Sequence, residues 1–113
     1  MYISEKVKNG IAVVSLKGDL LDIEDRSVFQ RKIQSLATDD INRVVLDLSM
    51  VNRINSEGLN TLITAYDTLR KSGGDLRLAR IDKSLHDILA ITRLVQVFGT
   101  YETVERAMAS YRN

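Results

Sequence analysis

The sequence predicts an α/β fold. From about residue 40 onward, short segments rich in apolar and β-branched residues alternate with segments whose apolar residues recur at steps of three and four. Such alternation is typical of strands joined by helical crossovers, in which the helices cover a parallel or mixed sheet. The 113 residues, of which 44% are hydrophobic and 27% charged, are enough to build one buried core. We therefore expect a single α/β domain over residues 1–113.

The first expected elements are two strands of a hairpin. Residues 3–7 and 11–16 are short apolar segments, and Lys8-Asn9-Gly10 lies between them. A glycine between two such segments favours a tight turn, because glycine tolerates a positive φ angle. We expect the two strands to pair antiparallel.

A first helix and a central strand are expected next. After residue 22, apolar residues fall near helical spacing, and polar residues occupy the other side. The apolar positions are Val28, Phe29, Ile33, Leu36 and Ala37, and the helix is expected to end near residues 38–40. Residues 43–48 (RVVLDL) are mostly apolar with little alternation, which is typical of a central strand covered on both faces.

The clearest helix begins at Ser56. Its apolar residues recur at steps of three and four, and it ends at Ser72-Gly73-Gly74, where glycine suits a left-handed helix terminus. After it we expect a strand over residues 76–79, a short helix with Leu85, Ile88 and Leu89, an edge strand over residues 94–98, and a last helix with Val104, Ala107, Met108 and Tyr111.

The composition excludes several classes of protein. Without cysteine, the chain has no disulfide framework, no thiolate zinc site and no cysteine nucleophile. Its sixteen basic and fifteen acidic residues are interspersed, whereas nucleic-acid binding normally needs a clear basic patch. No apolar run approaches the roughly 20 residues of a membrane-spanning helix, and the first residues lack a signal-peptide pattern. We expect a cytoplasmic protein that binds no nucleic acid and does not insert into a membrane.

The ionisable residues form no recognisable catalytic or metal site. His86, the only histidine, lies in a helix whose apolar residues face the core, so its imidazole is expected to lie in solvent without a partner. Paired carboxylates such as Asp39 and Asp40 lack the spacing of a calcium loop or a glycosidase pair. Gly73 and Gly74 follow a helix, whereas phosphate-binding glycines precede one. We expect no enzymatic activity, no metal and no cofactor.

Ser56 is the most informative candidate residue. It directly precedes the apolar period of the second helix, so the pattern alone predicts a helix cap whose hydroxyl accepts a backbone N–H bond. A phosphate at this position would meet N–H donors and the positive end of the helix dipole. Phosphorylation would add about 1.5 to 2 negative charges beside Glu57. A cap and a phosphorylated residue are both consistent with the pattern.

The sequence around Ser56 resembles the STAS domain, the family of the bacterial anti-sigma factor antagonists and of the C-terminal domains of sulfate transporters. The resemblance rests on residues 44–48 (VVLDL) followed by residues 55–59 (NSEGL), where the family has D-S-S-G-L or D-S-T-G-L. Residues 16–20 (LKGDL) are similar to the family's L-x-G-E-L. The chain departs from the motif at Asn55 and Glu57, which moves the negative charge from position 55 to position 57.

The resemblance implies both a fold and a mechanism. The fold would be a mixed sheet of about five strands flanked by four to five helices, without enzymatic activity. In the antagonists, the serine that corresponds to Ser56 is phosphorylated by a partner that is both a serine kinase and an anti-sigma factor. The unmodified antagonist binds this partner and frees the sigma factor, and the phosphorylated form is released. A phosphatase is a further candidate partner.

The resemblance also implies a partner-binding surface around the start of the second helix and the loop before the first. Its candidate residues are Leu20, Leu21, Asp22, Asn55, Glu57, Gly58 and Asn60. The small Gly58 is expected to let a partner backbone approach closely. Two alternatives stay open. One is a STAS scaffold or interaction module of a signalling or transport complex, in which Ser56 is only a cap and Glu57 supplies a permanent charge. The other is a small nucleotide- or lipid-binding domain, which no residue here requires.

Overall fold

The fold is a five-stranded sheet with helices on both faces. The computed structural model describes residues 2–20 and 23–111. The strands are β1 (Tyr2–Lys8), β2 (Ile11–Leu20), β3 (Arg43–Ile54), β4 (Asp75–Ala79) and β5 (Gly99–Tyr101). The helices are α1 (Ile23–Thr38), α2 (Ser56–Lys71), α3 (Lys83–Ile91), the short 3-10 helix η1 (Leu94–Gln96) and α4 (Val104–Ala109). The predicted α/β class is confirmed.

The sheet is mixed, with the strands in the order β1-β2-β3-β4-β5. β1 and β2 pair antiparallel, and the turn between them has positive φ angles at Asn9 (55°) and Gly10 (77°). Positive φ at both central residues is the geometry of a type I′ turn, whose twist matches that of the flanking strands. The remaining neighbours pair in parallel. The predicted hairpin therefore supplies the antiparallel edge of an otherwise parallel sheet.

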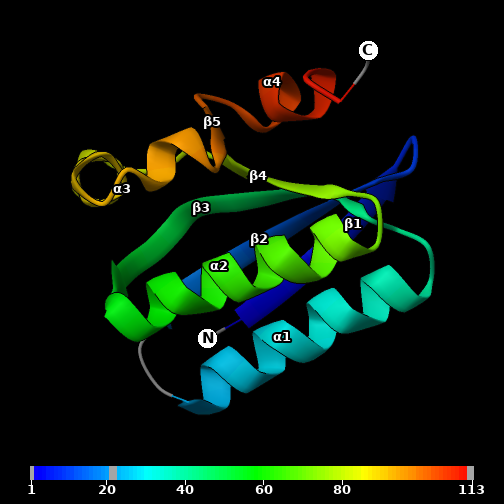
Figure 1. The fold of residues 1–113 in the computed structure, drawn as a ribbon, viewed down its shortest axis with the longest axis horizontal. Helices are drawn as coiled ribbons and strands as arrows, with labels where there is room; N and C mark the ends of the chain where they lie inside the picture. The colour runs from blue at the N-terminus through cyan, green and yellow to red at the C-terminus, as the bar shows by residue number, and fades with distance from the viewer. Residues whose placement is uncertain (1, 21–22, 112–113) are drawn as a thin grey trace.

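β3 is the middle strand and is buried on both faces. Val44 and Leu46 face the larger core, which includes residues of α1, α2 and α3, whereas Val45 faces a smaller core beneath α4. Figure 1 shows α1 and α2 on one side of the sheet and α4 on the other. Burial on both faces explains the unbroken apolar run and confirms the predicted central strand. β3 is longer than predicted. It continues to Ile54 and leads directly into α2.

The end of α2 is fixed by two glycines. Gly73 has a φ angle of 85°, and its N–H donates to the carbonyl oxygen of Arg70 at 3.0 Å. The N–H of Gly74 donates to the carbonyl oxygen of Leu69 at 2.8 Å. These two bonds form a Schellman motif, which needs a left-handed residue at the position of Gly73. The predicted role of glycine at this terminus is confirmed.

α1 buries a narrow stripe of its surface. Phe29, Ile33 and Leu36 are buried in the larger core. Val28, which the sequence placed on the same apolar side, is 44% exposed. Successive residues of a helix point about 100° apart, so Val28 lies well to one side of the stripe that contains Phe29. The prediction for Val28 is therefore wrong.

Residues 94–98 do not form the predicted edge strand. Leu94–Gln96 form η1, and the edge strand is β5, which pairs with β4. Arg93 turns the chain with a φ angle of 62°, and the buried Phe98 packs its ring edge-to-face on Tyr66, with centroids 5.5 Å apart. The apolar residues here form a turn that delivers Phe98 to the core. A short apolar run does not distinguish such a turn from a strand.

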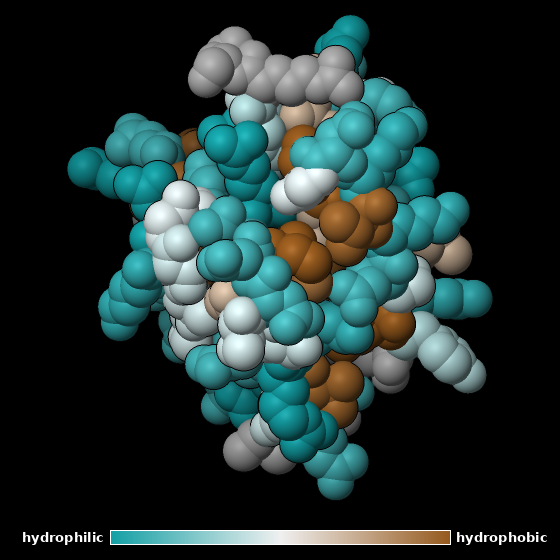
Figure 2. Space-filling model, turned by 90° about the vertical axis from the view of Figure 1, so that its right-hand side faces the viewer, coloured by the Kyte–Doolittle hydropathy of each residue, from teal (hydrophilic) through white to brown (hydrophobic). Residues whose placement is uncertain are grey.

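The sheet face beneath α4 is only partly covered. Tyr111, which follows α4, is buried and is tied to β3, because its Oη donates to the carbonyl oxygen of Val44 at 2.7 Å. Beyond α4, a hollow of about 990 Å³ opens over β1 and β2, and Val7, Val13 and Met108 contribute to its lining. Figure 2 looks onto the end of the molecule that carries the β1–β2 turn and shows hydrophobic surface in a strip among hydrophilic side chains. None of the described residues of the predicted partner surface lines this hollow.

Candidate partner-binding site

The start of α2 is capped by Asn55 and not by Ser56. Asn55 has extended backbone angles (φ −102°, ψ −177°), and its Oδ1 accepts a hydrogen bond of 2.8 Å from the N–H of Gly58. Asparagine suits this position because its side-chain oxygen satisfies an N–H group that has no partner within the helix. Ser56 is the first helical residue and is exposed. The prediction of a Ser56 cap is wrong, and a modified Ser56 would leave the cap in place.

The ends of β2 and β3 bring the two parts of the predicted surface together. Leu20 pairs with Ile54 in parallel register, so the end of β2 lies beside the residue that precedes Asn55. Arg53 Nη2 and Asp19 Oδ2 form an ion pair of 3.1 Å that joins the same two strand ends. Of the predicted loop residues, Leu21 and Asp22 lie outside the described residues, and only the backbone of Leu20 is described.

The predicted residues on α2 differ in exposure. Glu57 and Asn60 are exposed, three residues apart on the helix. Gly58 is buried, as are Thr61 and Leu62 of the same helix. The expectation that a partner backbone approaches Gly58 therefore does not match its position. Gly58 is thus a buried residue of the first turn, and Glu57 and Asn60 form the accessible surface.

Arg26 links α1 to the first turn of α2. Its Nη2 lies 3.2 Å from Oε2 of Glu57, and the two side chains are 24% and 63% exposed. One turn further along α1, Gln30 Nε2 donates to the carbonyl oxygen of Thr61 at 2.8 Å. All four residues line a groove of about 280 Å³ between the helices. Arg26 and Gln30 were not among the residues predicted from the sequence, although their spacing of four places them on one flank of a helix.

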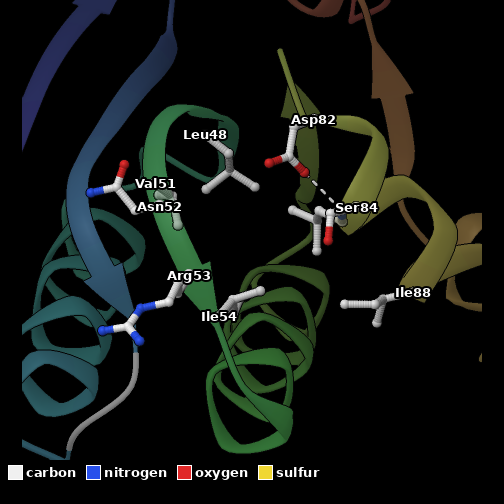
Figure 3. Close-up of a pocket in the computed structure, with 9 residues that line it drawn as sticks. Leu48, Val51, Asn52, Arg53, Ile54, Asp82, Ser84 and Ile88 are labelled. Atoms are coloured by element: carbon white, nitrogen blue, oxygen red, sulfur yellow. Dashed lines mark hydrogen bonds between the residues drawn. The ribbon is translucent and has the colours of Figure 1, made fainter.

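A second groove is lined in part by Ile54, the last residue of β3. It has a volume of about 280 Å³ and lies between the end of β3 and α3. Figure 3 shows Val51 and Ile54 on the β3 side and Ile88 on the α3 side. Asp82, at the rim, is engaged as the cap of α3, because its Oδ1 accepts a hydrogen bond of 2.8 Å from the N–H of Leu85. The groove thus offers apolar walls next to the start of α2.

Asp47, the acidic residue of the VVLDL segment, is a buried carboxylate that forms an ion pair with the half-exposed Arg80, away from this surface. Its carboxylate oxygens accept hydrogen bonds from Nε and Nη2 of Arg80, both at 3.1 Å, and Oδ1 also accepts one from the N–H of Ser49. Burial acts to raise the pKa of Asp47, which is only 8% exposed, but the hydrogen bonds from Arg80 and Ser49 outweigh burial and hold this pKa below its usual value. The pair therefore ties the end of β4 to β3.

Asp47→Asn is expected to lower the free energy of unfolding near neutral pH by about 1 kcal/mol, because it removes the charged acceptor of Arg80, whose side chain is half-exposed and stays solvated. Since the pKa of Asp47 is lowered in the folded protein, its stabilisation is present above the unfolded pKa and is lost as the pH falls through the folded pKa. Urea unfolding should show that the difference between the wild type and the variant shrinks from about pH 7 to about pH 2. The exposed Asp39→Asn is the control, and equal losses in the two variants would contradict the prediction.

The other ionisable candidates form no cluster. His86 is exposed on α3, as predicted. Within residues 2–20 and 23–111, no three His, Cys, Asp or Glu side chains are grouped so that they could hold a metal ion. The helices of this described part are also too short or too polar to cross a membrane.

The chain belongs to the STAS domain family. The STAS domain model matches residues 2–107, which include β1 to β5 and both parts of the predicted surface. The resemblance found in the sequence around Ser56 is therefore confirmed, and it extends over nearly the whole chain.

Several known proteins are similar to this chain over most of their length. The anti-sigma F factor antagonist of Paenibacillus polymyxa is 20% identical over 99 residues, which are 88% of this chain and 85% of that protein. The crystal structure of an anti-sigma factor antagonist from Mycobacterium paratuberculosis is 25% identical, with a TM-score of 0.85 over 99% of this chain and 94% of that one. The Bacillus protein SpoIIAA in its phosphorylated form has a TM-score of 0.77 at 16% identity, over 98% and 100% of the two chains. The mixed five-stranded sheet is thus that of the STAS fold.

Proposed function

We propose that this protein is an anti-sigma factor antagonist that binds an anti-sigma factor with serine kinase activity and is released when Ser56 is phosphorylated. One observation carries the proposal: in a STAS chain, Ser56 is exposed at the first position of α2 while Asn55 provides the cap. The relatives named as anti-sigma factor antagonists support it. SpoIIAA, which shares the fold, is known in phosphorylated and unphosphorylated forms.

The position of Ser56 suits a switch that acts on a partner. A phosphate at the amino end of α2 would be stabilised by the helix dipole, so the modified chain would stay folded. A hundredfold loss of affinity corresponds to about 2.8 kcal/mol. Placing a phosphate against a partner surface that offers no hydrogen-bond donors for it costs at least several kcal/mol. One phosphate is therefore sufficient to end the interaction.

In this proposal the partner contacts the exposed Asn55, Glu57 and Asn60 together with the end of β2 at Leu20 and the adjoining Leu21 and Asp22. Gly58 is buried beneath this surface. The protein acts by binding in the cytoplasm and catalyses no reaction. A phosphatase that removes the phosphate from Ser56 would complete the cycle.

The decisive experiment is phosphorylation by the cognate kinase. Incubation with this kinase and ATP should add one phosphate, which mass spectrometry should locate on Ser56. Ser56→Ala should take up none. Ser84→Ala is a matched control, because Ser84 is an exposed serine in the first turn of α3, and this variant should be modified like the wild type. A phosphate on another residue, or none on the wild type, would contradict the proposal.

A STAS interaction module without phosphorylation is the second candidate. It is favoured by Glu57, whose carboxylate places a permanent negative charge next to Ser56. Calorimetric titration of the partner separates the two functions. The switch predicts that Ser56→Asp binds at least tenfold more weakly than the wild type, whereas the module predicts equal affinities.

A further inference from the structure

We infer that Arg26, on α1, pairs with the phosphate of Ser56 when this residue is phosphorylated. The inference rests on the proposed function, since it assumes that Ser56 carries a phosphate in one state. It is carried by the ion pair of 3.2 Å between Arg26 and Glu57, which crosses from α1 to α2. Because Glu57 directly follows Ser56, this pair brings a guanidinium to the turn that would hold the phosphate.

The phosphate would enter a turn that is already negative. A phosphoserine carries about 1.5 to 2 negative charges, and Glu57 carries one more on the neighbouring residue. Adjacent Cα atoms are about 3.8 Å apart, so the two groups repel each other unless a cation lies close to both. Arg26 is already placed against Glu57, and its side chain is 24% exposed whereas that of Glu57 is 63% exposed.

The chemistry of the guanidinium allows Arg26 to change partners. Its planar fork of N–H donors matches phosphate as well as carboxylate oxygens, and charge-assisted bonds of this kind are strong. The greater charge of the phosphate favours it over the carboxylate of Glu57. Arg26 therefore holds Glu57 in the unmodified chain and is drawn to the phosphate in the modified one.

The exchange would act on the other half of the proposed partner surface. Arg26 lies in the first turn of α1, directly after the segment that joins β2 to this helix. The bond between Gln30 and the carbonyl oxygen of Thr61 holds α1 to α2 one turn further on. A new partner for Arg26 would thus change the ion pair between the first turns of the two helices while the helices stay together.

Phosphoserine incorporated at position 56 during translation tests the inference without any kinase. Phosphorus NMR then measures the second pKa of the phosphate in the folded protein. A guanidinium near the phosphate favours its dianion, so Arg26→Gln should raise this pKa by about 0.5 or more. Arg26→Lys keeps the charge but loses the fork and should give an intermediate value. Arg31→Gln, which changes an exposed arginine of the same helix, should leave the pKa unchanged.

A second background separates a direct contact from an indirect one. In the phosphoprotein with Glu57→Gln, Arg26→Gln should still raise the phosphate pKa if the guanidinium reaches the phosphate. The inference would be overturned if Arg26→Gln left the phosphate pKa unchanged, either in this background or in the phosphoprotein with Glu57. An equal pKa shift from Arg31→Gln would also overturn it. Since no kinase is involved, such a result would leave the proposed function standing, and failure of a kinase to modify Ser56 would leave this measurement unaffected.

Discussion

Phe29→Ala is expected to lower the free energy of unfolding by about 3–5 kcal/mol. Phe29 is among the largest fully buried side chains, and it projects from α1 into the larger core beside Ile33. Removing the ring loses its burial and leaves a cavity that the rigid sheet and α2 close only in part. Because small domains are stable by about 5–15 kcal/mol, this loss is a large fraction of the total. Urea unfolding followed by circular dichroism measures it.

Val28→Ala is the matched control for Phe29. The two residues are neighbours on α1, but the side chain of Val28 is 44% exposed. A substitution on the surface of a helix is expected to change the free energy of unfolding by no more than about 0.5 kcal/mol. If both variants lost several kcal/mol, the burial of α1 through the stripe that contains Phe29 would be wrong.

Gly74→Ala is expected to have the second largest effect, a loss of about 3 kcal/mol. A Cβ atom at position 74 would overlap the backbone carbonyl oxygen of Asn42 and lie 2.6 Å from the Cβ of Asn42. The same carbonyl oxygen accepts a hydrogen bond of 3.0 Å from the N–H of Asp75, at the start of the pairing between β3 and β4. Relief of the overlap would therefore move two paired strands apart, and thermal unfolding should reveal the loss.

Gly73→Ala provides the comparison for this prediction. A Cβ atom at position 73 would lie 3.9 Å from Nδ2 of Asn42, which is ordinary contact, so the cost comes from the φ angle of 85°. A residue with a Cβ atom in this left-handed region costs about 1–2 kcal/mol. Gly74→Ala should thus unfold at a lower temperature than Gly73→Ala, and the reverse order would refute the steric argument.

The elements that the sequence predicted well have local causes. The hairpin depends on the turn at Asn9 and Gly10, and α2 depends on its apolar period and on Gly73. Both signals lie within a few residues of the structure they produce. The prediction failed at Val28 and at residues 94–98, where an apolar residue had two possible environments and only packing against other elements selected one.

The sequence also predicted the candidate site only in part. The motif located the turn that contains Ser56 and Glu57, because a helix start has a recognisable pattern. The pattern did not show whether Asn55 or Ser56 is the cap, since both residue types serve in this role. It also did not show that Gly58 points inward, because the direction of a residue in the first turn depends on how α2 lies on the sheet.

By itself, the sequence determined the α/β class, the order of the main strands and helices, and the start of the second helix, because periods of two and 3.6 residues and turn residues are local properties. Its resemblance to the STAS family added the candidate phosphorylated residue at that helix start. Only the tertiary structure decided that Leu20 lies beside Ile54 and that Arg26 meets Glu57. These contacts join residues far apart in the chain, and they depend on strand order and helix packing, which no local period encodes. The start of α2 is therefore recognisable from the sequence, whereas its link to α1 is a product of the fold.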